Sequence, residues 1–447
     1  MLSQGVIHCL EALAAGRTTS EKLVRTALER IADPSGEGAR AFTEVFASEA
    51  MAAAAESDRR RAAGNARPLE GVPVSVKDLF DIEGRVTRAG SKVLANEAPA
   101  RADAEPVARL RAAGAVIVGR TNMTELAFSG LGLNPHYGTP ANPWDRAARH
   151  IPGGSSSGAA VSVADDMCAA GLGSDTGGSV RIPAALCGLA GFKPTQAAVS
   201  REGVYPLSPT LDSIGPIART IEDCALLYAV LSGTEVAAVW TGAPPRFLVP
   251  ENYVTDGMDD TVARTFEDAL SRLSAAGVTL VRRHVEAFDM LPEMAKAGAY
   301  PGIEAFAAQS ARLAARRDEF DPRVAARIIA AGALPADSAT RLDAIRKAYI
   351  TFLEKELTGV DGLLMPTVPV VAPLIEALAS DDAAYGAANL LMLRNPTAIN
   401  ILDGCAASLP LFATGSGAPV GLSVAGARGQ DARILGLAQY LAPILSN

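Results

Sequence analysis

The sequence predicts an α/β protein with a mostly parallel central sheet that helices cover on both faces. Two observations support this fold class. Stretches with helical apolar spacing repeatedly precede short apolar runs, and one segment alternates apolar and polar residues in the pattern of a strand. Helices that alternate with strands form parallel sheets, because each crossover helix packs back onto the sheet.

The N-terminal residues 1–65 predict a layer of helices. The segment Thr18-Thr-Ser-Glu21 has the pattern of a capping box, which satisfies the free N–H groups of a first helical turn. The apolar residues of 23–31 then fall on one helical face until Pro34 ends the pattern. We therefore expect a helix that begins near Thr18.

The first predicted strand follows Gly71. Val72, Val74 and Val76 alternate with polar or small residues, so these valines point to one face of the strand. Lys77 has the opposite parity and comes where the alternation ends. We therefore expect Lys77 near the end of a strand, on the face away from the valines.

Three later stretches repeat the order of helix and then strand. Each has helical apolar spacing, and each is followed by a short run of apolar residues. The helices and their strands are 103–113 and 116–118, 262–276 and 278–281, and 347–357 and 363–365.

Composition indicates an enzyme-sized globular protein. The chain has 447 residues, of which 49% are apolar and 20% charged, so it can bury a large core. Its 41 basic and 49 acidic residues give a net charge of -8 without a long basic run, which argues against nucleic acid as a partner. No uncharged apolar run of about 18 residues predicts a membrane span, and the N-terminus lacks the pattern of a secretory signal.

The cysteines and histidines exclude several kinds of site. Five widely separated cysteines form no CxxC pair, which is typical of a reducing, cytoplasmic compartment. Only four histidines occur, and none has metal-ligand spacing. We therefore expect no metal site and no histidine-based triad.

Three segments carry residues suited to catalysis: 71–78, 152–158 and 173–183. A serine hydroxyl attacks a carbonyl only when a base takes its proton, and with so few histidines the candidate base is Lys77. A free lysine has a pKa near 10.4 and is a cation at neutral pH, whereas burial lowers that pKa. A buried Lys77 could therefore act as a base, while an exposed one would be an ordinary surface charge.

The glycines before Ser179 suggest a site for a negatively charged oxygen. Gly177 and Gly178 allow a tight turn in which the N–H groups of Thr176, Gly177, Gly178 and Ser179 converge as an oxyanion hole. An ordinary glycine-rich turn is the alternative. The segment lacks the second glycine of a GxSxG nucleophile elbow.

The run 153–158, Gly-Gly-Ser-Ser-Ser-Gly, has its own alternatives. It could cradle a phosphate at a helix N-terminus, but it lacks the lysine of a GxxxxGK[ST] loop. A flexible linker is excluded by the apolar strand and helix patterns that lie within the wider segment 153–215.

Taken together, the three segments resemble the amidase signature family of serine amidohydrolases. They stand in that family's order, with Lys77 78 positions before Ser155 and Ser155 24 positions before Ser179. Further similar segments cover most of the chain: 18–23, 119–123, 142–144, 191–195, 212–216, 366–369 and 419–424.

The resemblance implies a triad and a fold. Ser179 matches the family's nucleophile, Ser155 the bridging serine, which follows a cis Gly154–Ser155 peptide bond, and Lys77 the base. The implied architecture is a single α/β/α domain over residues 1–447, with a large mixed sheet and the signature core in 71–220.

The resemblance assigns further residues to the site. Asp175, Arg181 and Ser156 match positions that hold the catalytic loops by polar contacts. The family also brings the segment after residue 122 near the triad, and two arginines are candidates for a substrate carboxylate. The predicted substrate pocket consists of Met123, Thr124, Phe128, Arg327 and Arg394.

The function implied is hydrolysis of a small amide or urea-like substrate, with no cofactor and no metal. One alternative is the glutaminase-type component of an amidotransferase complex, but the segment Leu393–Asn400 lacks the acidic residue expected to hold the amino group of glutamine. A second alternative is a non-catalytic scaffold, which would have no chemical need for all three triad residues. Homodimers are frequent in the family, although the sequence shows no interface.

Overall fold

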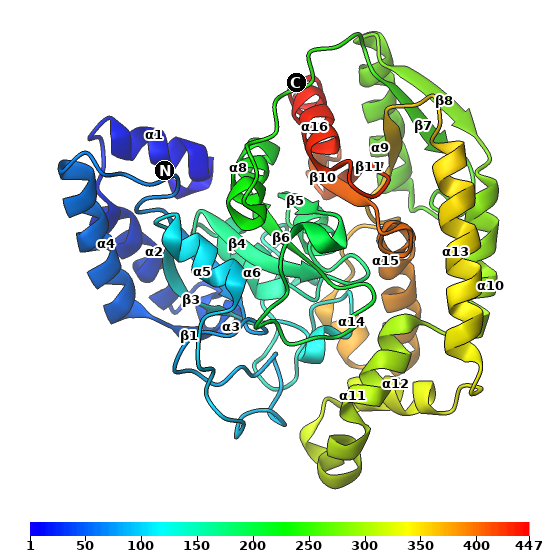
Figure 1. The fold of residues 1–447 in the computed structure, drawn as a ribbon, viewed down its shortest axis with the longest axis horizontal. Helices are drawn as coiled ribbons and strands as arrows, with labels where there is room; N and C mark the ends of the chain where they lie inside the picture. The colour runs from blue at the N-terminus through cyan, green and yellow to red at the C-terminus, as the bar shows by residue number, and fades with distance from the viewer. Residues whose placement is uncertain (447) are drawn as a thin grey trace.

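The computed structural model describes residues 1–446, and an 11-stranded sheet runs through its centre (Figure 1). The order of the strands differs from their order along the chain, so several connections cross over the sheet. From one edge to the other the strands are β1 (Phe42–Val45), β3 (Val116–Thr121), β2 (Pro73–Lys77), β4 (Ala170–Asp175), β6 (Ser213–Ala218), β5 (Ala190–Lys193), β10 (Cys405–Phe412), β11 (Pro419–Gly426), β9 (Gly362–Pro366), β7 (Arg246–Pro250) and β8 (Thr279–Arg283).

The sheet is mixed, and the expectation that it is mostly parallel is wrong. Six of its ten strand pairings are antiparallel. Parallel pairs occur where a helix lies between the strands, as with α5 (Glu105–Ala112) between β2 and β3. Antiparallel pairs such as β10 and β11 follow short connections that carry no helix, and helix–strand alternation alone does not reveal them.

Helices cover both faces of the sheet, as the fold class predicted. One face carries α8 (Ile221–Ser232), α9 (Asp260–Ala275) and α16 (Asp431–Leu445). The other carries α6 (Ser157–Ala164), α7 (Arg181–Leu186) and α15 (Asp382–Leu402). The remaining helices are α1 (Val6–Ala14), α2 (Ser20–Ala32), α3 (Gly38–Ala41), α4 (Ala47–Ala62), α10 (Leu291–Ala297), α11 (Tyr300–Arg316), α12 (Pro322–Gly332), α13 (Ser338–Glu356) and α14 (Ile375–Ala379).

The predicted N-terminal helix begins at Ser20 with Thr19 as its cap. The Thr19 hydroxyl accepts a hydrogen bond from the N–H of Lys22. The capping residue is therefore Thr19, and Glu21 lies one position too early to complete a capping box. The strands and helices predicted in 103–118, 262–281 and 347–365 are all present.

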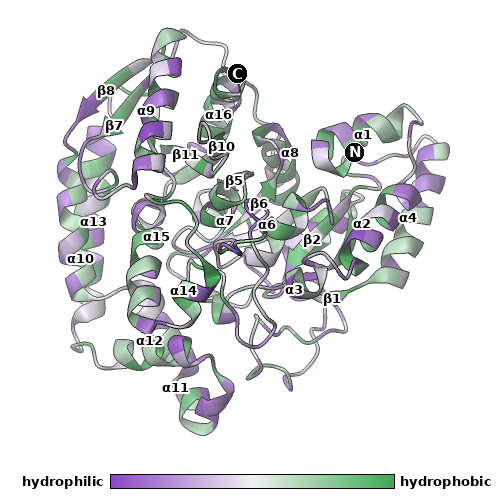
Figure 2. Ribbon diagram, turned by 180° about the vertical axis from the view of Figure 1, so that it is seen from behind, coloured by the Kyte–Doolittle hydropathy of each residue, from purple (hydrophilic) through white to green (hydrophobic). Residues whose placement is uncertain are grey.

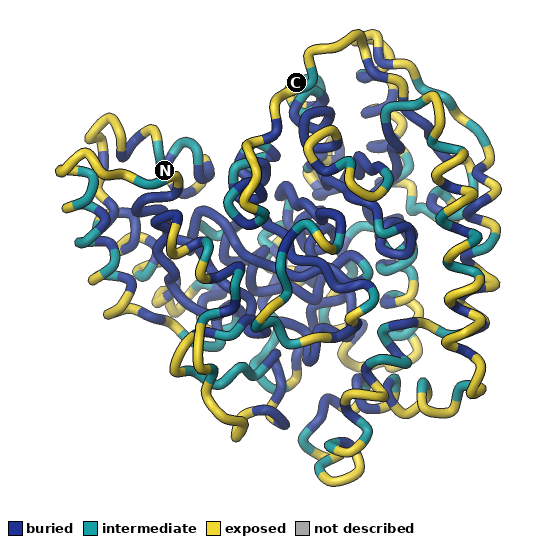
Figure 3. Tube along the Cα trace, in the orientation of Figure 1, coloured by how far each residue is buried: buried dark blue, intermediate teal, exposed yellow. Residues whose placement is uncertain are grey.

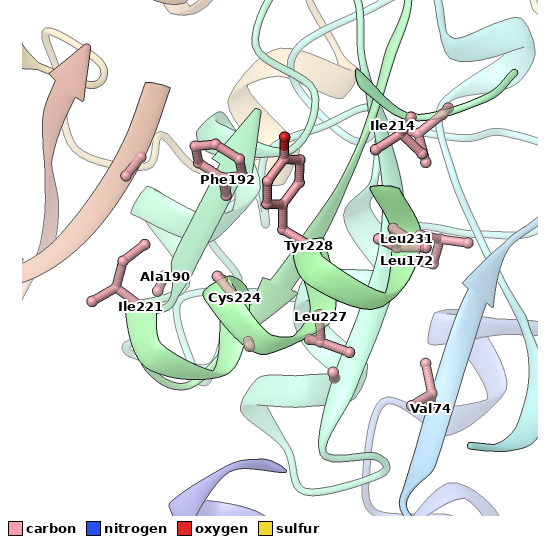
Figure 4. Close-up of a cluster of buried hydrophobic side chains, with 14 of the residues drawn as sticks. Val74, Leu172, Ala190, Phe192, Ile214, Ile221, Cys224, Leu227, Tyr228 and Leu231 are labelled. Atoms are coloured by element: carbon pink, nitrogen blue, oxygen red, sulfur yellow. The ribbon is translucent and has the colours of Figure 1, made fainter. Parts of the chain in front are cut away.

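The largest apolar core lies between α8 and the sheet. Figure 4 shows side chains of α8 against residues of four neighbouring strands, including Val74, Leu172, Phe192 and Ile214. The central strands are buried along their length, whereas α13 exposes one side to solvent (Figure 3). Accordingly, α9 and α13 mix hydrophilic and hydrophobic residues in Figure 2.

Small residues bring α6 close to the opposite face of the sheet. A β-carbon on Gly171 or Gly173 would lie 3.1 Å from Ala159 or 2.9 Å from Ser156, respectively, so glycine leaves room for the helix at both strand positions. The hydroxyls of Ser75 and Ser162 lie 2.9 Å apart across the same contact. This close packing fixes the serine-rich segment at the start of α6 against the ends of the strands.

No helix within residues 1–446 combines the length and the apolar character that a bilayer span requires.

Candidate active site

The three predicted catalytic segments meet at one edge of the sheet. Lys77 ends β2 and Asp175 ends β4, and these two strands are parallel neighbours. Strand β6 runs antiparallel to β4, so its first residue, Ser213, pairs with Asp175 at the same edge. The segment before α6 brings Ser155 to this edge, and the turn after β4 brings Ser179.

The Lys77 side chain is fully buried and hydrogen-bonded to two serines. Its Nζ lies 2.7 Å from Ser155 Oγ and 2.9 Å from Ser174 Oγ. As predicted from strand parity, Lys77 faces away from Val74 and Val76, which lie in the apolar core. Ser155 is therefore the hydroxyl through which Lys77 can exchange a proton with the cavity.

Burial makes Lys77 a base near neutral pH. Desolvation lowers the pKa of Lys77 to about 7, and the charges of Asp212 and Asp175 oppose that decrease. About half of the Lys77 side chains are then neutral at pH 7, whereas almost none would be at the ordinary pKa. The structure therefore supplies the deprotonated amine that proton abstraction needs.

The backbone around Ser155 is held on both sides. The Gly154–Ser155 peptide bond is cis, as the family resemblance implied. The Ser155 carbonyl accepts a hydrogen bond from the N–H of Thr124 at 3.1 Å. The next residue, Ser156, donates its N–H to the carbonyl of Ser179 at 3.3 Å, which links the two serine segments directly.

The turn at Ser179 leaves three N–H groups for an oxyanion, one fewer than predicted. The N–H of Gly178 donates to Asp175 Oδ1 at 2.8 Å, so the prediction is wrong for that group. The N–H groups of Thr176, Gly177 and Ser179 have no acceptor within residues 1–446. Nor does the Ser179 hydroxyl form a hydrogen bond with any described residue, and Ser179 lines the adjoining cavity.

A buried ion pair holds this turn. Both side chains of the Asp175–Arg181 pair are fully buried, with Arg181 Nη2 at 2.9 Å and Nε at 3.0 Å from the two carboxylate oxygens. Asn400 of α15 accepts from Arg181 at 2.6 Å and donates to Asp175 at 2.9 Å. Burial alone would raise the pKa of Asp175, but the Arg181 charge and these hydrogen bonds hold it well below its usual range.

A cavity of about 450 Å³ opens in front of Ser179. Its walls come largely from α10, α11, α12 and α15, which lie far from the signature core along the chain. Most of the lining is apolar, and none of the described lining residues is Asp or Glu. Representative residues are Leu207, Met294, Tyr300, Ala331, Leu393 and Ile401.

The structure separates the predicted pocket residues into two groups. Phe128, Arg327 and Arg394 line the cavity. Met123 does not: its side chain is buried in the apolar core. Thr124 is absent from the cavity wall as well, and its backbone supports Ser155 instead.

Comparison with known proteins agrees with this geometry. The family model described as Amidase matches residues 22–435. The chain belongs to the amidase family.

Individual relatives span most of its length. It is 36% identical to 2-amino-5-chloromuconic acid deaminase of Comamonas testosteroni over 83% of this chain and 81% of the relative. It is 34% identical to the A component of the glutamyl-tRNA(Gln) amidotransferase of Ralstonia pickettii strain 12J, covering 98% and 97% of the two chains. A crystal structure described as an amidase superposes with a TM-score of 0.89 at 33% identity, over 99% of this chain and all of the other.

In this member of the amidase family the two cavity arginines differ in their partners. Arg394 donates to the carbonyls of Asp256 and Val254 and to Asn395 Oδ1, so it anchors a loop. Arg327 donates one nitrogen to the Phe128 carbonyl, and its guanidinium stacks 4.1 Å above the Phe128 ring. Within residues 1–446 it has no carboxylate partner, and burial lowers its pKa.

The sequence did not indicate several residues of the site. Ser174 contacts Lys77 but carries no motif of its own beyond its place in a glycine-rich strand. Asn400 and Asp212 contact the Ser179 turn from distant parts of the chain. Both belong to segments quoted for the family resemblance, and that membership was the only signal that could have found them.

We predict that Arg181→Met destabilises the protein strongly, because it leaves the Asp175 carboxylate buried without its counter-charge. Breaking a buried ion pair in this way typically costs about 3–5 kcal/mol. Chemical denaturation monitored by circular dichroism measures the loss. The matched control is Arg282→Met, which removes the exposed Arg282–Glu267 pair and should change the stability far less. Equal effects of the two substitutions would contradict the structural role of Arg181.

Proposed function

We propose that this protein is a serine amidohydrolase that cleaves the C–N bond of a small amide or urea-like substrate through an acyl-enzyme on Ser179. The observation that carries the proposal is the buried Lys77, hydrogen-bonded to Ser155 beside a serine that opens to a cavity. We also propose that the whole chain forms one amidase domain, since a single sheet runs from β1 to β8.

The first step is acylation of Ser179. Neutral Lys77 accepts the proton of the Ser155 hydroxyl, and Ser155 takes the proton of Ser179 as Ser179 Oγ attacks the amide carbonyl. The carbonyl oxygen gains negative charge, and the N–H groups of Thr176, Gly177 and Ser179 stabilise it. The proton then returns through Ser155 to the nitrogen, the C–N bond breaks, and ammonia or an amine leaves.

The second step is hydrolysis of the Ser179 ester. Water enters the place of the departed amine and attacks the ester carbonyl while Ser155 and Lys77 accept its proton. The same proton returns to Ser179 Oγ as the C–O bond breaks and the carboxylic acid is released. Lys77 ends the cycle neutral, so no cofactor is consumed.

The cavity favours a substrate without positive charge. Its apolar walls suit an apolar body, and its charged lining residues, Arg327 and Arg394, are both basic. Since Arg327 lacks a carboxylate partner, we propose that it binds a carboxylate or another anionic group of the substrate. The relative from Comamonas testosteroni supports this proposal, because its name gives an acid as the compound on which it acts.

The glutaminase-type component of an amidotransferase is the second candidate, and its support is the similarity to such proteins over nearly the whole chain. The cavity favours it less, since Leu393 stands near the position where an acidic residue would hold the amino group of glutamine. The two functions differ in their need for partners. A purified chain that releases ammonia from simple amides on its own would exclude dependence on a partner protein.

We predict that a fluorophosphonate forms one covalent adduct, on Ser179. Ser179→Ala should abolish the adduct, and Lys77→Met should slow labelling about a hundredfold or more, because no base then takes the serine proton. Intact-protein mass spectrometry with peptide mapping measures both. Ser208→Ala is the control for a nearby serine outside the triad and should label at the normal rate. Labelling of Ser179→Ala at the wild-type rate would contradict the proposal.

We predict that Arg327→Met weakens turnover of amides that carry a distal carboxylate and affects uncharged amides much less. Loss of a charged hydrogen-bond partner should reduce kcat/KM for the anionic substrates about tenfold or more. Ammonia release from matched pairs of charged and neutral amides measures the difference. The control is Arg323→Met on the same helix, which changes the net charge equally and contacts Asp382 instead of the catalytic cavity. An equal loss for both substrate types would contradict the assignment.

A further inference from the structure

We propose that Asp212 is a positioning residue of this site: its carboxylate holds the turn that carries Ser179 through Thr176, and its negative charge acts on Lys77. The inference rests on the proposed function and adds to it a residue outside the triad. Asp212 touches neither the cavity nor the reacting atoms, so its role is exerted through Thr176 and Lys77.

The contacts of Asp212 fix one side of the catalytic turn. Thr176 Oγ1 donates to Asp212 Oδ1 at 2.5 Å. The other carboxylate oxygen accepts the N–H groups of Leu207 and Ser208 at 2.9 and 3.0 Å. Asp212 therefore joins the turn 176–179 to the segment 207–208, and Leu207 is itself part of the cavity wall.

The sheet brings Asp212 to the same edge as Lys77. Asp212 directly precedes Ser213, which pairs with Asp175 and donates its hydroxyl to the Asp175 carbonyl at 2.8 Å. Strand β4 lies between β6 and β2, so the ends that carry Asp212 and Lys77 are two strand spacings apart, roughly 10 Å. Both side chains are buried, and water screens their interaction only weakly.

Two carboxylates act on Lys77, and they differ in compensation. Asp175 comes from β4 and is paired with the buried Arg181. Asp212 has no ion pair within residues 1–446, and its only cationic influence is the more distant Arg201. Burial raises the pKa of Asp212 to about 6, so it remains mostly ionised at pH 7 and above. Asp212 is thus the uncompensated negative charge in the surroundings of Lys77.

The two effects of Asp212 are separable by substitution. Removal of its charge makes the protonated form of Lys77 less stable, so Lys77 becomes neutral at a lower pH. The acidic limb of the rate profile then moves toward lower pH. Removal of the Thr176 hydroxyl leaves the charge in place but frees the turn, which should lower the rate without moving the limb.

The test is the rate constant for fluorophosphonate labelling of Ser179, measured from about pH 5 to about pH 9 in the full-length protein. For Asp212→Asn we expect the midpoint of the acidic limb to fall by about one pH unit, as for a unit charge roughly 10 Å away at an effective dielectric constant near 20. For Thr176→Val we expect about tenfold slower labelling at the plateau and an unchanged midpoint, and Thr176→Ser should restore the rate.

A midpoint for Asp212→Asn equal to that of the wild type would overturn the charge effect, and a wild-type plateau for Thr176→Val would overturn the positioning effect. Circular dichroism establishes that each variant is folded. If Asp212→Asn does not fold, Asp212→Ser removes the same charge with a smaller side chain and is judged by the same midpoint. Failure of the wild type to label at Ser179 would instead reject the proposed function, so the two failures are distinguishable.

Discussion

The burial of Lys77 is the constraint on which the site depends. An amine in this position loses its hydration, and desolvation is the main reason why its pKa falls to about 7. The protein compensates with neutral partners, the hydroxyls of Ser155 and Ser174, rather than with a carboxylate in contact. An acid beside Lys77 would stabilise the cation and remove the base.

The negative charges near Lys77 are accordingly kept at a distance or balanced. Asp175 lies at the end of the neighbouring strand, and Arg181 and Asn400 occupy its oxygens. The same carboxylate takes the N–H of Gly178, which shapes the turn and leaves the N–H groups on either side for the oxyanion. One buried ion pair thus limits the electrostatic effect on Lys77 and also positions Ser179.

Local patterns in the sequence indicated the parts of the site that depend on local structure. The alternation before Lys77 predicted its strand position and its face, and glycines at 177 and 178 predicted a tight turn. The direction of the strands, the contact of Asp212 with Thr176 and the cavity walls from α10 to α15 were not predictable in this way. They depend on contacts between residues far apart in the chain, and no local periodicity encodes such contacts.

The most direct test of the account is the ¹⁵N NMR titration of the Lys77 side-chain nitrogen in protein labelled at lysine. The chain has only seven lysines, and Lys77→Met and Lys193→Met assign the signals of the two that are buried. The account predicts that Lys77 loses its proton near pH 7. A Lys77 signal that titrates near the ordinary lysine value of about 10.4 would contradict it, because the triad would then have no base at neutral pH.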